Sequence, residues 1–131
     1  MDLSNTNKIT SFTHLDAWRE SHALVLMTYK ISKSFPKEEI FGLTSQMRRA
    51  AVSVSSNIAE GFSRNTKRDK QQFYAIAKGS LTELQNQYII CRDLGYITKD
   101  DFNTIAKKTV DVSKLINGLI RSSNSKPEQS Q

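Results

Sequence analysis

The sequence predicts an all-α protein, an antiparallel up-down-up-down four-helix bundle. Apolar side chains recur at steps of three and four residues in four separate stretches, which places them on one face of each of four α-helices. Only a few residues connect these stretches, so consecutive helices must pack side by side in opposite directions. At 131 residues the chain is one domain by length and can bury most of the surface that its unfolded state exposes.

The first helix is predicted at about residues 15–34, after a polar N-terminal arm at residues 1–12 whose Phe12 packs on the bundle. Its expected core face follows spacings of 3, 4, 3 and 4: Leu15, Trp18, His22, Val25 and Tyr29. A second apolar line runs beside this face: Ala17, Leu24 and Ile31. The Phe35-Pro36 pair ends the helix, because proline excludes the α conformation from the residue before it and cannot donate an N–H.

The second helix is predicted at about residues 42–61 and combines an apolar stripe with a run of small residues. The stripe is spaced at threes and fours: Leu43, Met47, Ala50, Val54 and Ile58. Small side chains let neighbouring helices approach closely: Ala50, Ala51, Ser53, Ser55 and Ser56. Gly61 is expected just past the helix end, where the chain needs a positive φ.

The third and fourth helices are predicted at about residues 67–94 and 99–121. The core face of the third is expected to hold Phe73, Ala77, Leu81, Leu84, Tyr88 and Cys91, widened by Ile76 and Ile90. Gly95 closes that helix. The fourth has an unbroken repeat: Phe102, Ile105, Thr109, Val112, Ile116 and Leu119. Residues 123–131 are predicted to be a disordered polar tail.

Three expected helix starts share one local pattern, a threonine followed three residues later by an aspartate. The pairs are Thr13 and Asp16, Thr66 and Asp69, and Thr98 and Asp101. Each threonine hydroxyl can accept a hydrogen bond from a first-turn N–H, while the aspartate favours the positive end of the helix dipole. The three pairs support the predicted helix count.

Nothing in the chain matches a catalytic, metal or cofactor motif. The single cysteine, Cys91, lies on an apolar stripe and is interpreted as a buried structural thiol, and His22 as a packed histidine without a second ligand in reach. Asn57 and Glu60 favour a helix-end network or an intersubunit contact over catalysis. The chain is therefore predicted not to be an enzyme, with no catalytic residue, metal or cofactor.

The sequence also lacks a secretory signal and any apolar run long enough for a transmembrane helix. A single cysteine excludes a disulfide framework within one chain and is typical of a reducing compartment. We therefore expect a cytoplasmic protein that does not enter a membrane.

The net charge of +6 is concentrated in one third of the chain, because residues 42–80 hold seven basic side chains and two acidic ones. Antiparallel packing brings the second turn to the same end as the last turn of the fourth helix, and gathers Arg64, Lys67, Arg68, Lys70, Arg121 and Lys126 there. Tyr74, one turn along, could add base stacking. The candidate nucleic-acid-binding residues are Arg48, Arg49, Arg64, Lys67, Arg68 and Lys70.

Two alternatives remain open for these charges. A basic cluster also fits a plain solvated surface, since phosphate binding leaves no sequence signature beyond clustered Lys and Arg. The basic end or the apolar side faces could instead hold a protein partner, which would make the chain an interaction scaffold. Apolar residues beside the seams predict a homo-oligomer: Leu24, Ile31, Ile89, Ile90 and Ile120.

Long segments of the chain closely resemble a known family. The strings FPKEEIFGLTSQMRRA, SNIAEG and LGY, within about residues 12–122, are similar to four-helix bundle proteins encoded in intervening sequences of bacterial 23S ribosomal RNA genes. The resemblance implies a cytoplasmic bacterial homopentamer, related to diversity-generating retroelement accessory proteins that bind nucleic acid and a reverse transcriptase. It supplies no catalytic residues. The family usually has proline at the position of Ser55, where serine should bend the second helix less.

Overall fold

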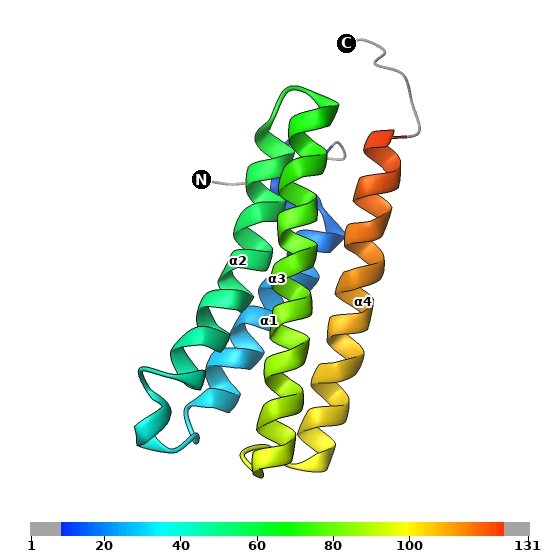
Figure 1. Ribbon diagram of the computed structural model, residues 1–131. Helices are drawn as coiled ribbons and strands as arrows, with labels where there is room; N and C mark the ends of the chain where they lie inside the picture. The colour runs from blue at the N-terminus through cyan, green and yellow to red at the C-terminus, as the bar shows by residue number, and fades with distance from the viewer. Residues whose placement is uncertain (1–8, 125–131) are drawn as a thin grey trace.

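The computed structural model describes residues 9–124 and contains, within that range, four α-helices packed as a bundle. The helices are α1 (Asp16–Ser32), α2 (Leu43–Ser63), α3 (Lys67–Leu94) and α4 (Lys99–Asn124). Consecutive helices run in opposite directions and α4 packs back against α1, which confirms the predicted up-down-up-down topology (Figure 1). None of these helices is long and apolar enough to cross a membrane.

Two short 3₁₀ turns complete the described elements, η1 (Phe12–His14) before α1 and η2 (Lys37–Glu39) before α2. Phe12 packs its ring edge against Trp18, with 5.3 Å between ring centroids, as expected for the end of the arm. The rest of the predicted arm at 1–8, and the predicted tail from residue 125, lie outside the described residues. Helix α4 continues to Asn124, three residues beyond its predicted end.

Two of the three predicted threonine caps are confirmed. The hydroxyls of Thr66 and Thr98 each accept a hydrogen bond, at 3.1 Å, from the backbone N–H of the aspartate three residues later. The prediction for Thr13 is wrong, because Thr13 lies inside η1, where its own N–H donates to Ser11 Oγ. Leu15, in an extended conformation, separates η1 from α1 and provides no side-chain cap.

The core faces of α2 and α4 are confirmed, and most of the α3 face is. The residues with the least exposed surface include Met47, Val54, Ile58, Leu84, Val112 and Ile116. On α3, however, Ile76 and Ile90 are 46% and 39% exposed and do not widen the core. Helix α2 passes through Ser55 without a break, and the Ser55 hydroxyl donates to the Val52 carbonyl at 3.2 Å.

The predicted core face of α1 is only partly confirmed. Leu15, Trp18 and Val25 pack against the core, but the most deeply buried side chains lie on the second predicted line, where Leu24 is 0% exposed. Small and hydroxyl-bearing residues face the core together with Leu24: Ala17, Ser21, Thr28 and Ser32. His22 is exposed and Tyr29 is 40% exposed. The Thr28 hydroxyl and the Tyr88 phenol form a buried hydrogen bond of 2.6 Å between α1 and α3. A polar anchor therefore fixes the orientation of α1 where apolar periodicity alone indicates another face.

The prediction for Gly61 is also wrong. Gly61 is buried inside α2, which continues for two more residues. A Cβ atom there would lie 2.7 Å from Cε1 of Tyr74 on α3. Glycine is therefore needed for close helix packing rather than for a left-handed backbone. Gly95 does close α3 in the left-handed conformation, with φ of 78°, as predicted.

The end of the bundle that holds the α1–α2 and α3–α4 connections is tied together by Glu39. One carboxylate oxygen accepts from the backbone N–H of Leu43 at 3.2 Å, and the other accepts from the Tyr96 hydroxyl at 2.9 Å. Since Gly42 offers no side chain to cap α2, the Glu39 carboxylate takes that role from the preceding turn.

Candidate nucleic-acid interface

The six candidate basic residues do not form one cluster. Arg48 and Arg49 lie in the second turn of α2, whereas Arg64 follows its last residue. The sixteen intervening helical steps correspond to about 24 Å at 1.5 Å per residue. The structure therefore brings together only four of the candidates, Arg64, Lys67, Arg68 and Lys70, which we call the basic turn.

Arg48 and Arg49 both connect α2 to its neighbours. Arg48 Nε donates to Ser32 Oγ at 2.8 Å, and its guanidinium lies 4.8 Å from the centre of the Tyr29 ring. Arg49 Nη2 lies 3.0 Å from Glu83 Oε2 on α3, where it forms an ion pair. These contacts give both arginines a packing role within the subunit.

Two members of the basic turn are also engaged. Arg64 pairs with Glu60 at 2.6 Å and lies over the Phe73 ring, 4.5 Å from its centre. Lys70 Nζ donates to the Phe62 carbonyl at 2.8 Å, and so closes the C-terminal end of α2. Burial lowers the pKa of Lys70. The sequence predicted the charges of these two residues but not the rings of Phe62 and Phe73 beneath them.

Lys67 and Arg68 make no hydrogen bond, ion pair or ring contact with the described part of the chain, residues 9–124. Arg68 is exposed and Lys67 is half-buried. The α2–α3 connection lies at the same end of the bundle as the last turn of α4, which carries the exposed Arg121 (Figure 1). Lys126, also expected here, lies outside the described residues.

Tyr74 is not available for base stacking, contrary to the sequence-based expectation. Its side chain is 3% exposed and packs on Gly61, and burial raises the pKa of its phenol. Asn57 donates to the Ser53 carbonyl at 2.8 Å. Glu60 pairs with Arg64, so Asn57 and Glu60 both belong to local networks on the surface of α2.

The single cysteine is a buried thiol. Cys91 is 0% exposed, and its Sγ lies 3.3 Å from Met47 Sδ. Burial raises the pKa of Cys91 to about 12, so the thiol is protonated at neutral pH. Within residues 9–124, no group of three or more His, Cys, Asp or Glu side chains is placed to hold a metal ion.

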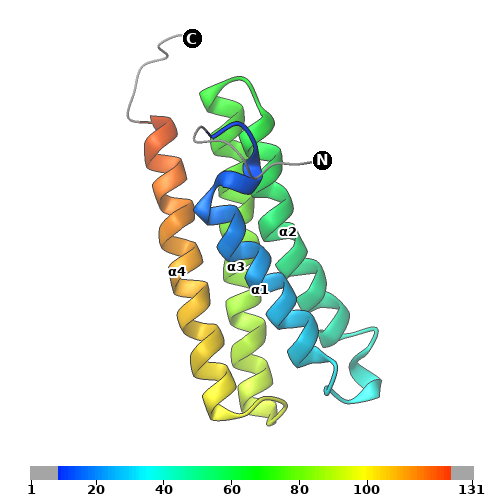
Figure 2. The ribbon, with the colours of Figure 1, turned by 180° about the vertical axis from the view of Figure 1, so that it is seen from behind.

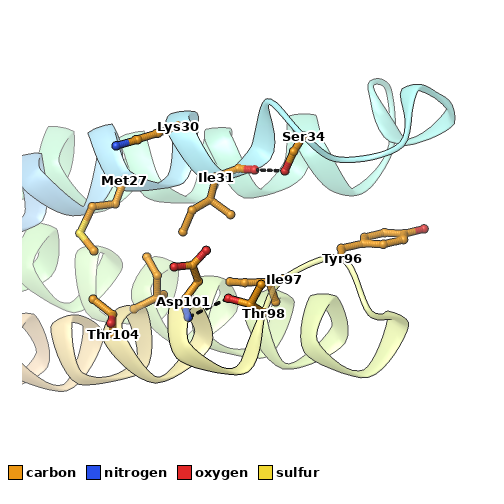
Figure 3. Close-up of a pocket in the computed structure, with 10 residues that line it drawn as sticks. Met27, Lys30, Ile31, Ser34, Tyr96, Ile97, Thr98, Asp101 and Thr104 are labelled. Atoms are coloured by element: carbon orange, nitrogen blue, oxygen red, sulfur yellow. Dashed lines mark hydrogen bonds between the residues drawn. The ribbon is translucent and has the colours of Figure 1, made fainter.

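A pocket of about 400 Å³ lies between α1 and the start of α4 (Figure 3). The two helices diverge toward this end of the bundle, which opens the space (Figure 2). Met27, Ile31 and Ile97 line it, with Lys30 and Asp101 at the rim. Asp101 points from α4 toward α1, and Lys30 extends along α1 away from Ser34 (Figure 3). The sequence did not predict this pocket, because it depends on the angle between two helices far apart in the chain.

Comparisons with known proteins agree with this fold. Residues 13–118 match the family model described as 23S rRNA-intervening sequence protein. The chain is also similar to the crystal structure of a protein of unknown function from the S23 ribosomal protein family of Bacteroides thetaiotaomicron. That match has a TM-score of 0.72 and 19% sequence identity, and covers 80% of this chain and 98% of the other. Among curated proteins, none matches the chain significantly.

Proposed function

Because this chain belongs to the family of 23S rRNA-intervening sequence proteins, we propose that it is a non-enzymatic, cytoplasmic helical bundle that binds nucleic acid, RNA or DNA, through phosphate contacts. The site is the basic turn between α2 and α3. Phosphate contacts need only exposed Lys and Arg side chains, so binding is the activity that the charges of this turn support.

One observation carries this proposal, the unpaired state of Lys67 and Arg68. An ion pair within the subunit already neutralises Arg64, whereas these two side chains have no carboxylate within salt-bridge distance among the described residues. Unpaired cations on an exposed turn can neutralise phosphates and release their counterions.

We expect the double charge reversal Lys67→Glu/Arg68→Glu to raise the Kd for RNA or DNA about ten-fold or more at low salt. The slope of log K against log salt is negative, and its magnitude should decrease by about 2, because two phosphate contacts are lost. Fluorescence anisotropy with labelled RNA and DNA at several salt concentrations measures both quantities. The matched control is Lys99→Glu/Lys107→Glu, which makes the same charge change on exposed residues of α4. Equal losses in both variants, or no binding by the wild type at low salt, would refute the proposal.

We also propose that the chain assembles as a homo-oligomer, a pentamer as the family resemblance implies. Exposed apolar side chains support association: Ile40 and Phe41 in the α1–α2 connection are 50% and 95% exposed, and Leu94 is 55% exposed. We expect Phe41→Asp to lower the mass measured by size-exclusion chromatography with light scattering at micromolar concentration. A wild type that elutes as a monomer contradicts the proposal.

The same apolar end favours a second candidate function, a scaffold for a protein partner such as a reverse transcriptase. Phe41 is an isolated exposed ring, the residue type that anchors protein interfaces. In this case a pull-down should recover one protein in a fixed ratio without nucleic acid. If the Phe41 ring contacts the partner and not another copy of the chain, Phe41→Asp should abolish that capture and leave the mass of the assembly unchanged, the opposite of the result expected above for a subunit contact.

A further inference from the structure

Helix α1 directs its small and hydroxyl side chains into the core, whereas the rings of His22 and Tyr29 face the surface and that of Trp18 is only partly buried. Ala17, Ser21 and Thr28 are buried, whereas His22 is exposed and Tyr29 is 40% exposed. Bundle helices normally bury their aromatic residues, which contribute most to core packing. Core packing accounts for part of the Trp18 ring, but it does not explain why this helix carries His22 and Tyr29.

The rings form an ordered row along α1. Trp18, His22, Leu26 and Tyr29, which we call the outer face of α1, are spaced by four, four and three residues and so share one side of the helix. The Trp18 and His22 rings are stacked, with 4.7 Å between centroids and 13° between planes. The Arg48 guanidinium lies over the ring of Tyr29. The face thus presents planar groups that are already held in position.

The charges around this face are predominantly positive. Lys33 is exposed directly after the last residue of α1, and Arg48 reaches the face from α2. The two acids of α1 are both engaged, since Asp16 pairs with Arg19 and Glu20 pairs with Lys108 on α4. A polyanion along the outer face would therefore meet cations and no free carboxylate of this helix.

We propose that the outer face of α1 binds single-stranded nucleic acid by stacking unpaired bases on its rings. The inference rests on the proposed function, because it takes nucleic acid as the partner and adds the preference for single strands. Stacking on aromatic side chains together with cations along the backbone is how proteins bind single strands without sequence preference. Bases in a duplex are stacked on one another and cannot reach such a face.

A membrane surface is the other partner that an aromatic and basic helix face suits. An interfacial helix inserts a broad aliphatic side into the lipid. Leu26 is the one aliphatic residue of the outer face, and the rest of it consists of rings. The composition of the face therefore favours nucleobases over acyl chains.

The test compares a labelled single-stranded RNA with its blunt-ended duplex by fluorescence anisotropy. We expect the wild type to prefer the single strand, and His22→Leu/Tyr29→Leu to weaken single-strand binding about ten-fold with duplex binding unchanged. Leucine keeps apolar bulk at these exposed positions and removes the ring planes, so folding should be preserved. Ile76→Ala is the matched control, because it removes exposed apolar bulk on α3 rather than on α1 and should not change the affinity. The single strand should also quench the fluorescence of Trp18.

The outcomes separate the two proposals. If the wild type binds neither the single-stranded RNA nor the duplex, the proposed function and this inference are both refuted. If the wild type binds RNA and only Lys67→Glu/Arg68→Glu weakens binding, the proposed function stands and the inference is overturned. The inference is also overturned if His22→Leu/Tyr29→Leu lowers the mass in light scattering, which would make the face a contact between copies. Anionic vesicles that bind the wild type but not this variant, with RNA binding retained, would likewise overturn it.

Discussion

Replacing Gly61 with alanine is expected to destabilise the bundle by about 1–3 kcal/mol, the usual cost of overpacking a core. The added Cβ would lie 2.7 Å from Cε1 and 2.9 Å from Cδ1 of Tyr74, and 3.1 Å from Cβ of Phe73. Tyr74 is buried and cannot move aside freely. Either α2 and α3 must separate or the ring must leave its rotamer, and both cost packing energy.

Gly79→Ala is the matched control, since it makes the same substitution within a helix without a steric contact. Gly79 lies inside α3, and a Cβ there would meet nothing within 4 Å. Alanine has the higher helix propensity, so this variant should be more stable than the wild type by up to about 1 kcal/mol. Urea unfolding followed by circular dichroism measures both changes. If both variants changed the free energy of unfolding in the same direction, the contact between Gly61 and Tyr74 would not be what determines the effect of Gly61→Ala.

The two glycines that the sequence placed at helix ends show where local rules suffice. Gly95 was predicted from the end of an apolar repeat, and the left-handed backbone it adopts is a property of its own turn. The requirement at Gly61 comes from Tyr74, thirteen residues away on the next helix. A single sequence shows that a glycine is present, but the ring it faces is known only once the two helices are packed.

The orientation of α1 could not be predicted for a related reason. Apolar periodicity assigns a core face from side-chain hydrophobicity alone, and Trp18, His22 and Tyr29 fit that pattern. The observed face depends instead on Thr28, whose partner Tyr88 lies 60 residues away. On α4 the residue that accepts a hydrogen bond from α3 is Thr109, which already lies on the predicted apolar face, and there periodicity predicted the buried residues correctly.

The candidate site was predicted only in part. The sequence shows which side chains are basic, but it does not show which of them contact other side chains of the same subunit. The basic turn is local in the chain and was correctly placed at one end of the bundle. The ion pair of Arg49 with Glu83 joins two helices and could not be foreseen from spacing. Setting aside the four candidates that make hydrogen bonds or ion pairs within the subunit leaves Lys67 and Arg68, a smaller site than the charge count indicated.

Removing one partner of the buried hydrogen bond between Thr28 and Tyr88 is expected to lower the free energy of unfolding by about 1–3 kcal/mol. In Tyr88→Phe the Thr28 hydroxyl, which is 0% exposed, loses its partner. In Thr28→Val the Tyr88 phenol, which is 2% exposed, is left unpaired. The double variant leaves no orphaned group and should be within about 1 kcal/mol of the wild type. Strictly additive losses in urea unfolding would show that the bond does not orient α1.

The pH dependence of the same variants tests the burial of the phenol. Burial raises the pKa of Tyr88 above the usual value of about 10 for a tyrosine, so the folded chain keeps the proton where the unfolded chain has lost it. The contribution of the neutral phenol to stability is therefore fully present below about pH 10 and is lost as the pH rises toward the folded pKa. Tyr88→Phe lacks this loss. The stability gap between the wild type and Tyr88→Phe should narrow above about pH 10, and a constant gap would show that the phenol is not desolvated in the fold.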